Sequence, residues 1–337
     1  MVRVGVVGTG AIGTEHIRRM SEVLSGAKVV AVTDINLEAA NRVAKKYGAR
    51  VENTEDTLIS ANDIDAIVVT SYGSAHEKTV LKVIKEGKFV FCEKPLADTA
   101  AGCKRIVEAE IAHGKRLVQV GFMRRYDKAY NLLKAKLDSG EYGKPLTVHC
   151  KHRNASMDAS FTTRMSITEG FIHEIDILHW LINDVYESAQ IIVPKTSTLS
   201  HPGMKDPLVM ILRTKTGMYL EVEIFINSQV IYEVQTEVAC ENGILQMPQP
   251  LSVQTIKDGL CGNDVDTSWK YRFIEAYDAE FQAWIDSVMN GKATGPTAWD
   301  GYVAAVTSDA CLKSLDSRKI ESVTFGEYPD FYNDDFS

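Results

Sequence analysis

The first third of the chain alternates short apolar runs with longer stretches in which apolar residues recur every three or four positions. The short runs lack the polar alternation of a half-exposed sheet, so they are typical of strands that helices cover on both faces. Strands are expected at residues 2–7, 28–33, 66–70, 88–91 and 117–120. Helices are expected at residues 12–24, 37–47, 76–85 and 100–112. This order predicts a doubly wound parallel sheet of the α/β class.

The pattern changes after about residue 122, where helices are expected at residues 126–137 and 167–181 and the strands alternate apolar with polar positions. One face of such a strand carries Leu220, Val222, Ile224 and Ile226. Its other face carries Tyr219, Glu221, Glu223 and Phe225. This alternation predicts an α+β part with a large, open, mostly antiparallel sheet that is covered on one face. The outer face fits either a subunit interface or a solvated surface.

The change of pattern divides the 337 residues into two predicted domains. Residues 1–122 are expected to form the parallel-sheet domain, and residues 123–337 an α+β domain for substrate binding and oligomerisation. Two further helices, expected at residues 271–289 and 297–315, are predicted to pack between the domains and back onto the first. A chain of this length is typical of two domains.

Composition narrows the class of protein. Apolar residues make up 45% of the chain and charged residues 24%, which is typical of a globular protein. The net charge is −8 and the chain has no basic run, so no nucleic-acid partner is expected. The six cysteines are scattered, which favours reduced thiols packed as small apolar side chains. The chain starts without a leader-like segment and has no run of about 18 apolar residues, so we expect a cytoplasmic protein without a membrane partner.

A glycine motif follows the first predicted strand. Gly8-Thr9-Gly10-Ala11-Ile12-Gly13 matches G-x-G-x-x-G, and Asp34 ends the second strand about 20 residues later. Gly8 permits the tight turn, Gly10 lets the backbone approach a pyrophosphate, and Gly13 lets helix and strand pack closely. Asp34 would accept hydrogen bonds from ribose hydroxyls and repel a 2′-phosphate. The motif therefore predicts a Rossmann domain that binds NAD rather than NADP.

A second motif carries a resemblance to a known family. Phe91-Cys92-Glu93-Lys94-Pro95-Leu96 comes at the end of the strand predicted at residues 88–91 and resembles the Glu-Lys-Pro signature of the glucose-fructose oxidoreductase / inositol dehydrogenase (Gfo/Idh/MocA) family. Residues 6–13, 119–127, 173–176 and 295–302 are also similar to this family, so the resemblance spans nearly the whole chain. It implies NAD-dependent oxidation of a secondary hydroxyl of inositol in inositol catabolism, with 2-keto-myo-inositol as the product from myo-inositol. It also implies a homotetramer that packs through its large open sheets.

Oxidation of a secondary alcohol needs a base for the hydroxyl proton and a cation near the developing alkoxide. Lys94 and His173 can fill these roles, and the resemblance implies a catalytic part for Lys94 and the general base role for His173. The family usually has an Asp four residues before this His, where Glu169 stands here. In an α-helix that spacing puts both side chains on one face, so Glu169 is expected to orient His173.

The resemblance also implies substrate contacts for Arg124, Asn154, Asp176 and Tyr232. Arg124 fits a salt-bridged position at the domain junction equally well. Around the cofactor, contacts are expected from Ser71, Tyr72 and His76, which follow the strand predicted at residues 66–70, and from Glu93 and Lys94. Plain loop packing explains Ser71, Tyr72 and His76 about as well.

Three alternatives to this interpretation are considered. A zinc site of the zincin type needs a second His four residues after His173, but Ile177 stands there, so no metal is expected. A non-catalytic NAD-sensing regulator could have the same fold, although the presence of both Lys94 and His173 argues against it. A dehydrogenase of another sugar or cyclitol is the serious alternative. Scyllo-inositol stays open beside myo-inositol because the two differ only in the orientation of one hydroxyl.

Overall fold

The computed structural model describes residues 1–248 and 252–333, and these fall into two compact units. The first unit holds residues 1–123, residues 277–306 and the segment from Phe325 onwards. The second unit holds residues 124–276 and 307–324. The chain therefore returns from the second unit to the first near residue 277, and both of the last long helices are shared between the units.

The first unit is built on a six-stranded sheet with the order β3-β2-β1-β4-β5-β6, in which every neighbouring pair is parallel. Its strands are β1 (Val2–Val7), β2 (Ala27–Thr33), β3 (Arg50–Val51), β4 (Ala66–Val69), β5 (Phe89–Glu93) and β6 (Val118–Gly121). The predicted doubly wound parallel sheet is confirmed. The strand order reverses between β1 and β4, and ligands of such folds bind beyond the carboxyl ends of the strands at this point.

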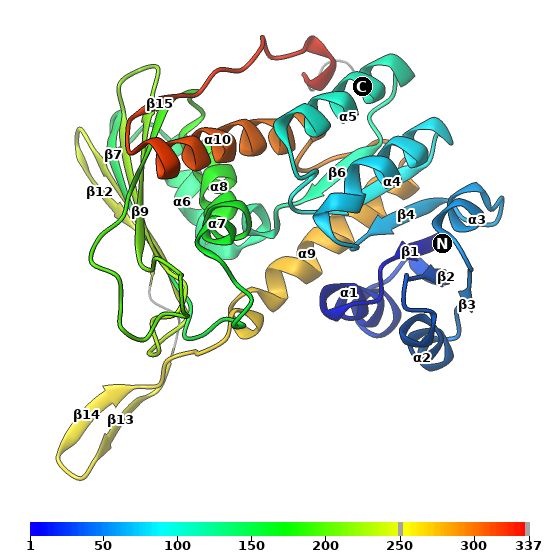
Figure 1. Cartoon of the computed structure of the whole chain (residues 1–337), viewed down its shortest axis with the longest axis horizontal. Coiled ribbons are helices and arrows are strands. Elements are labelled where there is room, and N and C mark those ends of the chain that lie inside the picture. The colour runs from blue at the N-terminus through cyan, green and yellow to red at the C-terminus, as the bar shows by residue number, and fades with distance from the viewer. Residues whose placement is uncertain (249–251, 334–337) are drawn as a thin grey trace. The chain divides into compact units, whose positions relative to one another are not determined.

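The helices of this sheet are α1 (Ala11–Glu22), α2 (Leu37–Tyr47), α3 (Glu55–Ser60), α4 (Gly73–Lys85) and α5 (Ala100–His113), and they surround the sheet in Figure 1. Side-chain caps explain several of their starts, since Asn36 caps α2 and Thr99 caps α5. Left-handed glycines end the same two helices. The sequence pattern did not predict β3 and α3, because both are too short to show a period.

The second unit is built on a seven-stranded sheet with the order β12-β11-β7-β10-β9-β8-β15. Its strands are β7 (Pro145–Arg153), β8 (Tyr186–Ile192), β9 (Leu208–Thr214), β10 (Tyr219–Phe225), β11 (Glu233–Cys240), β12 (Gly243–Gln246) and β15 (Glu321–Ser322). Only β7 and β10 pair in parallel. The prediction of a mostly antiparallel second sheet is therefore confirmed.

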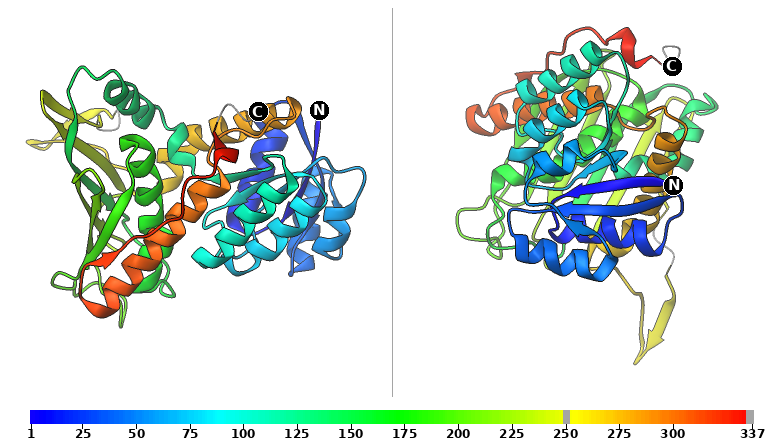
Figure 2. Two further views of the ribbon diagram at one scale, coloured as in Figure 1. Left: turned by 90° about the horizontal axis from the view of Figure 1, so that it is seen from above. Right: turned by 90° about the vertical axis from the view of Figure 1, so that its right-hand side faces the viewer.

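The two faces of this large sheet differ as the alternation predicts. Leu220, Val222 and Ile224 are fully buried, whereas the residues between them on β10 are half-buried. Helices α6 (Lys128–Asp138) and α8 (Ile172–Ile182) lie on one face of the sheet in both Figure 1 and Figure 2, and no described helix of this unit lies on the other. Among the described residues of the unit, the strands form this open face.

One predicted helix has a different form in the structure. The continuous α-helix expected at residues 167–181 is wrong: a short helix α7 (Thr163–Met165) leads into a π-helix over Ser166–Phe171, and only α8 is α-helical. A side chain at Gly170 would meet Ile224 of β10 at 2.5 Å, so this turn packs closely against the sheet. Similarly, α6 starts at Lys128 because Asp127 caps it, and Met123–Tyr126 is a 3₁₀ turn.

The last elements include a hairpin of β13 (Gln254–Lys257) and β14 (Leu260–Asn263), exposed along its whole length, and the long helices α9 (Trp269–Met289) and α10 (Ala298–Ser317). Five of the six cysteines are buried, as expected, and Cys261 on β14 is exposed. Within the described ranges, no helix is long and apolar enough to cross a membrane.

Candidate active site

The glycine loop between β1 and α1 is shaped by close backbone contacts. Gly8 has a φ of +101°, and a side chain there would meet the backbone of Thr70 and Ser71 at 2.7 Å. A side chain at Gly13 would meet the carbonyl oxygen of Gly8 at 2.3 Å. The space beside Gly10 is different: apart from its chain neighbours and the backbone of its own helix, no atom of the described residues lies within 4 Å of the position of its missing Cβ. Gly8 and Gly13 are therefore needed for the fold, and Gly10 leaves room for a ligand.

The N-terminus of α1 opens onto this space. Gly10 is its N-cap residue, no side chain caps the helix, and its first turn carries no acidic residue. The amide groups of Ala11, Ile12 and Gly13 at such a terminus attract an anion, because the first N–H groups of a helix have no carbonyl partner within it. The arrangement fits the pyrophosphate of a dinucleotide.

Asp34 lies after β2 beside the glycine loop. Its Oδ2 accepts hydrogen bonds from Thr9 N at 2.6 Å and Thr9 Oγ1 at 3.0 Å, and its Oδ1 accepts one from Asn36 N at 2.8 Å. A carboxylate offers about four lone-pair sites, so the loop orients Asp34 and leaves capacity for the hydroxyls of a ribose. The half-buried charge fits the predicted contact.

The loop after β4 contains Ser71, Tyr72 and His76. His76 is buried, with Nδ1 2.7 Å from Pro95 O and Nε2 2.9 Å from Ser71 O. Each ring nitrogen therefore lies within hydrogen-bond distance of a backbone carbonyl oxygen, so His76 ties this loop to the segment that follows Lys94. The Ser71 hydroxyl is buried and has no hydrogen-bond partner in the described part of the chain, and Tyr72 is 79% exposed. These two side chains are available to a ligand.

Glu93 and Lys94 follow β5, at the same edge of the sheet. The Glu93 carboxylate is buried against His16 of α1, and its second oxygen accepts the Lys94 amide at 3.2 Å. Burial alone would raise the pKa of Glu93, but the hydrogen bond to His16 and the neighbouring charges hold it below its usual value. Sequence reasoning missed His16, although its place on α1 just after the glycine motif was a usable signal.

In the second unit, His173 lies in the first turn of α8 and Glu169 lies in the preceding π-helix. Both side chains are half-buried. The expectation that one α-helical turn separates them is wrong, because a π-helix winds with hydrogen bonds from residue i to i+5.

Arg124 is fully buried in the second unit and forms an ion pair with Glu174. His152 completes the group, with Nδ1 3.1 Å from Glu174 Oε2. Burial would raise the pKa of Glu174, yet Arg124 and His152 hold it below its usual value, so the carboxylate stays ionised. Arg124 Nε is buried with no partner among residues 1–248 and 252–333, which leaves one donor for a ligand. Sequence reasoning named Arg124 but missed Glu174 and His152, which no local spacing connects to it.

Asp176 is held in the same way by Arg125, the residue that follows Arg124. Arg125 Nε lies 3.0 Å from Oδ2 of Asp176, and Arg125 Nη2 lies 2.5 Å from Oδ1. Such bidentate pairs fix the plane of the carboxylate. The two arginines after β6 thus each pair with one buried carboxylate of α8.

Asn154 and Tyr232, the remaining predicted substrate contacts, are also buried. The Asn154 backbone is fixed by Phe225 O at 2.9 Å, and its side-chain oxygen Oδ1 has no partner in the described ranges. Tyr232 stands edge-on to the rings of His152 and Phe273, and burial raises its pKa to about 12. Its phenol is therefore neutral at physiological pH.

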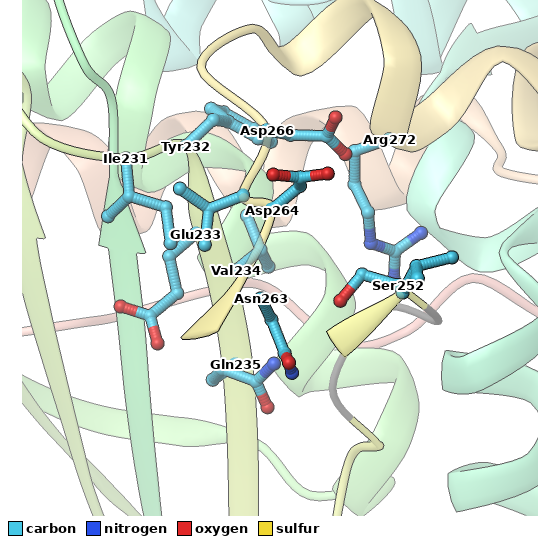
Figure 3. A pocket seen from close by; sticks show the side chains of 12 residues that line it. Ile231, Tyr232, Glu233, Val234, Gln235, Ser252, Asn263, Asp264, Asp266 and Arg272 are labelled. Carbon is cyan, nitrogen blue, oxygen red and sulfur yellow. The ribbon is translucent and has the colours of Figure 1, made fainter. Parts of the chain in front are cut away.

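Tyr232 also lines a pocket of about 400 Å³ in the second unit. Figure 3 shows Asp264, Asp266 and Arg272 gathered at one end of this pocket and Glu233 and Gln235 along β11. Arg272 is already paired with Asp127, at 2.5 Å and 3.0 Å. Over the described part of the chain, no cluster of three or more His, Cys, Asp or Glu side chains could hold a metal ion.

The parallel sheet, the glycine loop and the carboxylate after β2 define a dinucleotide-binding oxidoreductase. Comparison with known families agrees. Residues 2–122 match the oxidoreductase family with NAD-binding Rossmann fold, and residues 134–325 match the C-terminal α/β domain of the same family. The chain belongs to the Gfo/Idh/MocA oxidoreductase family, as the Glu-Lys-Pro motif predicted.

Individual relatives match nearly the whole chain. It is 53% identical over 333 residues to an inositol 2-dehydrogenase of Azotobacter vinelandii, covering 98% of both chains. It is 51% identical to an inositol 2-dehydrogenase/D-chiro-inositol 3-dehydrogenase of Shouchella clausii, covering 98% of this chain and 96% of that one. A crystal structure of myo-inositol dehydrogenase from Lactobacillus casei in complex with NAD(H) and myo-inositol is 43% identical, with a TM-score of 0.97 over 99% of this chain and 100% of that one.

The contrast between Gly10 and Gly13 gives a test of the glycine loop. Gly13→Ala should lower the free energy of unfolding by about 1–3 kcal/mol, because the methyl group has no room. Gly10→Ala should leave stability almost unchanged but weaken NAD binding by roughly tenfold or more, because the methyl group would stand where the pyrophosphate approaches. Thermal denaturation without NAD and titration with NADH measure the two effects. Equal stability losses in the two variants, or unchanged NADH affinity of Gly10→Ala, would contradict this interpretation.

Proposed function

We propose that this chain is an inositol 2-dehydrogenase, which oxidises a secondary hydroxyl of myo-inositol to a ketone with NAD as the acceptor. The observation that carries the proposal is its near-full-length similarity to the Lactobacillus casei enzyme, whose structure contains both NAD(H) and myo-inositol. The 53% identical relative bears the same enzyme name. A cytoplasmic role in inositol catabolism belongs to the same proposal.

The residues of the first unit fit the cofactor. The open space at Gly10 and the uncapped start of α1 suit the pyrophosphate, and the carboxylate of Asp34 suits the adenosine ribose. The Ser71 hydroxyl and the exposed Tyr72 ring are further contacts, held in place by His76. NAD supplies the hydride acceptor when bound.

The remaining chemistry falls to side chains of the chain itself. His173 takes the proton of the hydroxyl group that is oxidised, since an imidazole titrates near neutral pH. The ammonium group of Lys94 donates a hydrogen bond to the same oxygen and stabilises it as negative charge develops. Glu169 orients His173 from the π-helix.

The charges of the second unit support an uncharged substrate. Arg124 is neutralised by Glu174, and Arg125 by Asp176, so these polar groups carry no net charge. The partnerless Arg124 Nε and Asn154 Oδ1, with the neutral Tyr232 phenol, supply donors and acceptors for a polyol. The carboxylate of a sugar acid would find no uncompensated cation among these contacts.

Two alternatives remain to be separated from this proposal. The name of the Shouchella clausii relative includes D-chiro-inositol 3-dehydrogenase, which makes D-chiro-inositol a second candidate substrate. An NAD-sensing regulator would bind the cofactor without turnover, so steady production of NADH with any polyol excludes it.

Initial rates of NADH formation test the substrate and the two catalytic residues together. Myo-inositol should react faster than scyllo-inositol, D-chiro-inositol and glucose. Lys94→Ala and His173→Ala should each lower kcat by ~10²-fold or more, the usual contribution of a placed acid or base, with little change in the Kd of NADH. Lys104→Ala and His113→Ala, both exposed on α5, are matched controls and should keep the wild-type rate. If the wild type is inactive with all four compounds, the proposed function is refuted. If Lys94→Ala or His173→Ala keeps a kcat near that of the wild type, the replaced residue does not have its proposed role.

Cofactor choice should depend on Asp34. The wild type should have a higher kcat/KM with NAD than with NADP. Asp34→Ser should lower the ratio of these two kcat/KM values by roughly tenfold or more, because it removes a charge that repels the 2′-phosphate of NADP. Wild-type kcat/KM values that are equal for NAD and NADP would show that Asp34 does not select the cofactor.

We also propose that the chain forms a homotetramer through the open face of the large sheet. Light scattering should give the mass of four chains of 37.3 kDa. Phe225→Lys should lower that mass, because it places an unpaired charge in the half-buried centre of the face. Leu132→Lys, on the exposed side of α6, is the control and should leave the mass unchanged. A wild-type particle of 37.3 kDa at micromolar concentration would refute the tetramer.

A further inference from the structure

A buried chain of polar side chains in the first unit ends at Lys94. It begins on α9, where Asp278 accepts a hydrogen bond from Arg19 Nε at 2.6 Å. Arg19 Nη1 lies 2.7 Å from Nδ1 of His16, and His16 Nε2 lies 2.7 Å from Oε1 of Glu93. The second oxygen of Glu93 accepts the Lys94 amide. Four side chains thus connect α9 to the backbone of Lys94 by way of α1.

The neighbours of His16 select one tautomer of its ring. A guanidinium has only donors, so the nitrogen that faces Arg19 must accept. The proton is therefore on Nε2, and His16 donates to the carboxylate of Glu93. Burial lowers the pKa of His16 even though Glu93 opposes that shift, which agrees with a neutral ring beside an ionised carboxylate.

Packing leaves this pair little freedom. The His16 ring lies 4.2 Å from the Phe281 ring and 5.7 Å from the Tyr277 ring, measured between centroids. On the far side of Glu93, a Cβ at Gly121 would stand 3.1 Å from the carboxylate. The carboxylate of Glu93 is therefore held by His16 in the orientation that receives the Lys94 amide.

We propose that His16 is a positioning residue, which places Lys94 by holding the Glu93 carboxylate. This inference rests on the proposed function, in which Lys94 stabilises the reacting oxygen. His16 lies on the helix that starts at the glycine loop, so the same helix that receives the pyrophosphate also sets the backbone of Lys94. A displacement of about 1 Å in such a group can cost up to 10²-fold in rate.

Two substitutions of His16 separate its two hydrogen bonds. Gln places an amide nitrogen near the position of Nε2 and keeps the donor to Glu93, whereas Asn places its polar atoms near Nδ1 and loses that donor. His16→Asn should lower kcat by about 10- to 100-fold with the Kd of NADH within about threefold of wild type. His16→Gln should keep kcat within about threefold of wild type. Equal losses in the two variants, or no loss in His16→Asn, would overturn the proposal.

A double substitution tests whether His16 acts through Lys94. If it does, His16→Asn should slow Lys94→Ala no further, because the group that it positions is already absent. Independent, multiplicative losses would assign His16 a general structural role and overturn the proposal. If His16→Asn does not fold, Arg19→Gln tests the proposal in its place, with Arg18→Gln as the control. Arg19→Gln should lower kcat. Arg18 is the neighbour of Arg19 on α1 and pairs with the surface residue Glu15, so Arg18→Gln should leave kcat unchanged. Equal kcat values in these two variants would also overturn the proposal.

Hydrogen exchange separates failure of this proposal from failure of the proposed function. In the wild type and both His16 variants, exchange of the Lys94 amide can be followed by mass spectrometry of the peptide over residues 89–97, without any substrate. His16→Asn should exchange faster than His16→Gln. That result would support the positioning role even if no polyol were turned over, and identical exchange in the two variants would refute it even in an active enzyme.

Discussion

The Glu93 carboxylate is a buried charge at the end of β5, and a buried charge persists only where its surroundings compensate it. His16 does so from α1, and Arg19 and Asp278 fix His16 in turn. The carboxyl end of β5, helix α1 and helix α9 are therefore tied to one group. Removal of any link leaves a polar group buried without its partner.

In the second unit, arginines compensate the buried carboxylates. Glu174 and Asp176 project from α8, and each is matched by one of the two consecutive arginines after β6. These pairs cost desolvation, so they are a weak source of stability. Their effect is on binding instead, because the two pairs hold polar atoms rigidly while their charges cancel. A ring that carries several hydroxyls and no charge is the class of substrate that such a surface recognises.

Local patterns in the sequence were sufficient for most of the fold. Apart from the short β3 and α3, the strands and helices of the parallel sheet follow from apolar periodicity. The glycine motif has sterically strict positions at Gly8 and Gly13. The alternation on β10 matches its buried and half-buried faces. What could not be predicted lies in contacts between distant residues. Asp278 reaches Arg19 across 259 positions, and Glu174 meets His152 only because β7 and α8 share a core. The π-helix was missed because one extra residue in a turn leaves the hydrophobic pattern nearly unchanged.

That π-helix bears on the proposed role of Glu169, because Glu169 lies within it. A Glu carboxylate stands one methylene farther from its backbone than that of an Asp would. The wider turn over Ser166–Phe171 changes the angle at which that backbone faces His173. Gly170 allows this turn to lie against Ile224, so β10 determines how closely the segment approaches the sheet. The distance from Glu169 to the imidazole therefore depends on the sheet as well as on the length of the side chain.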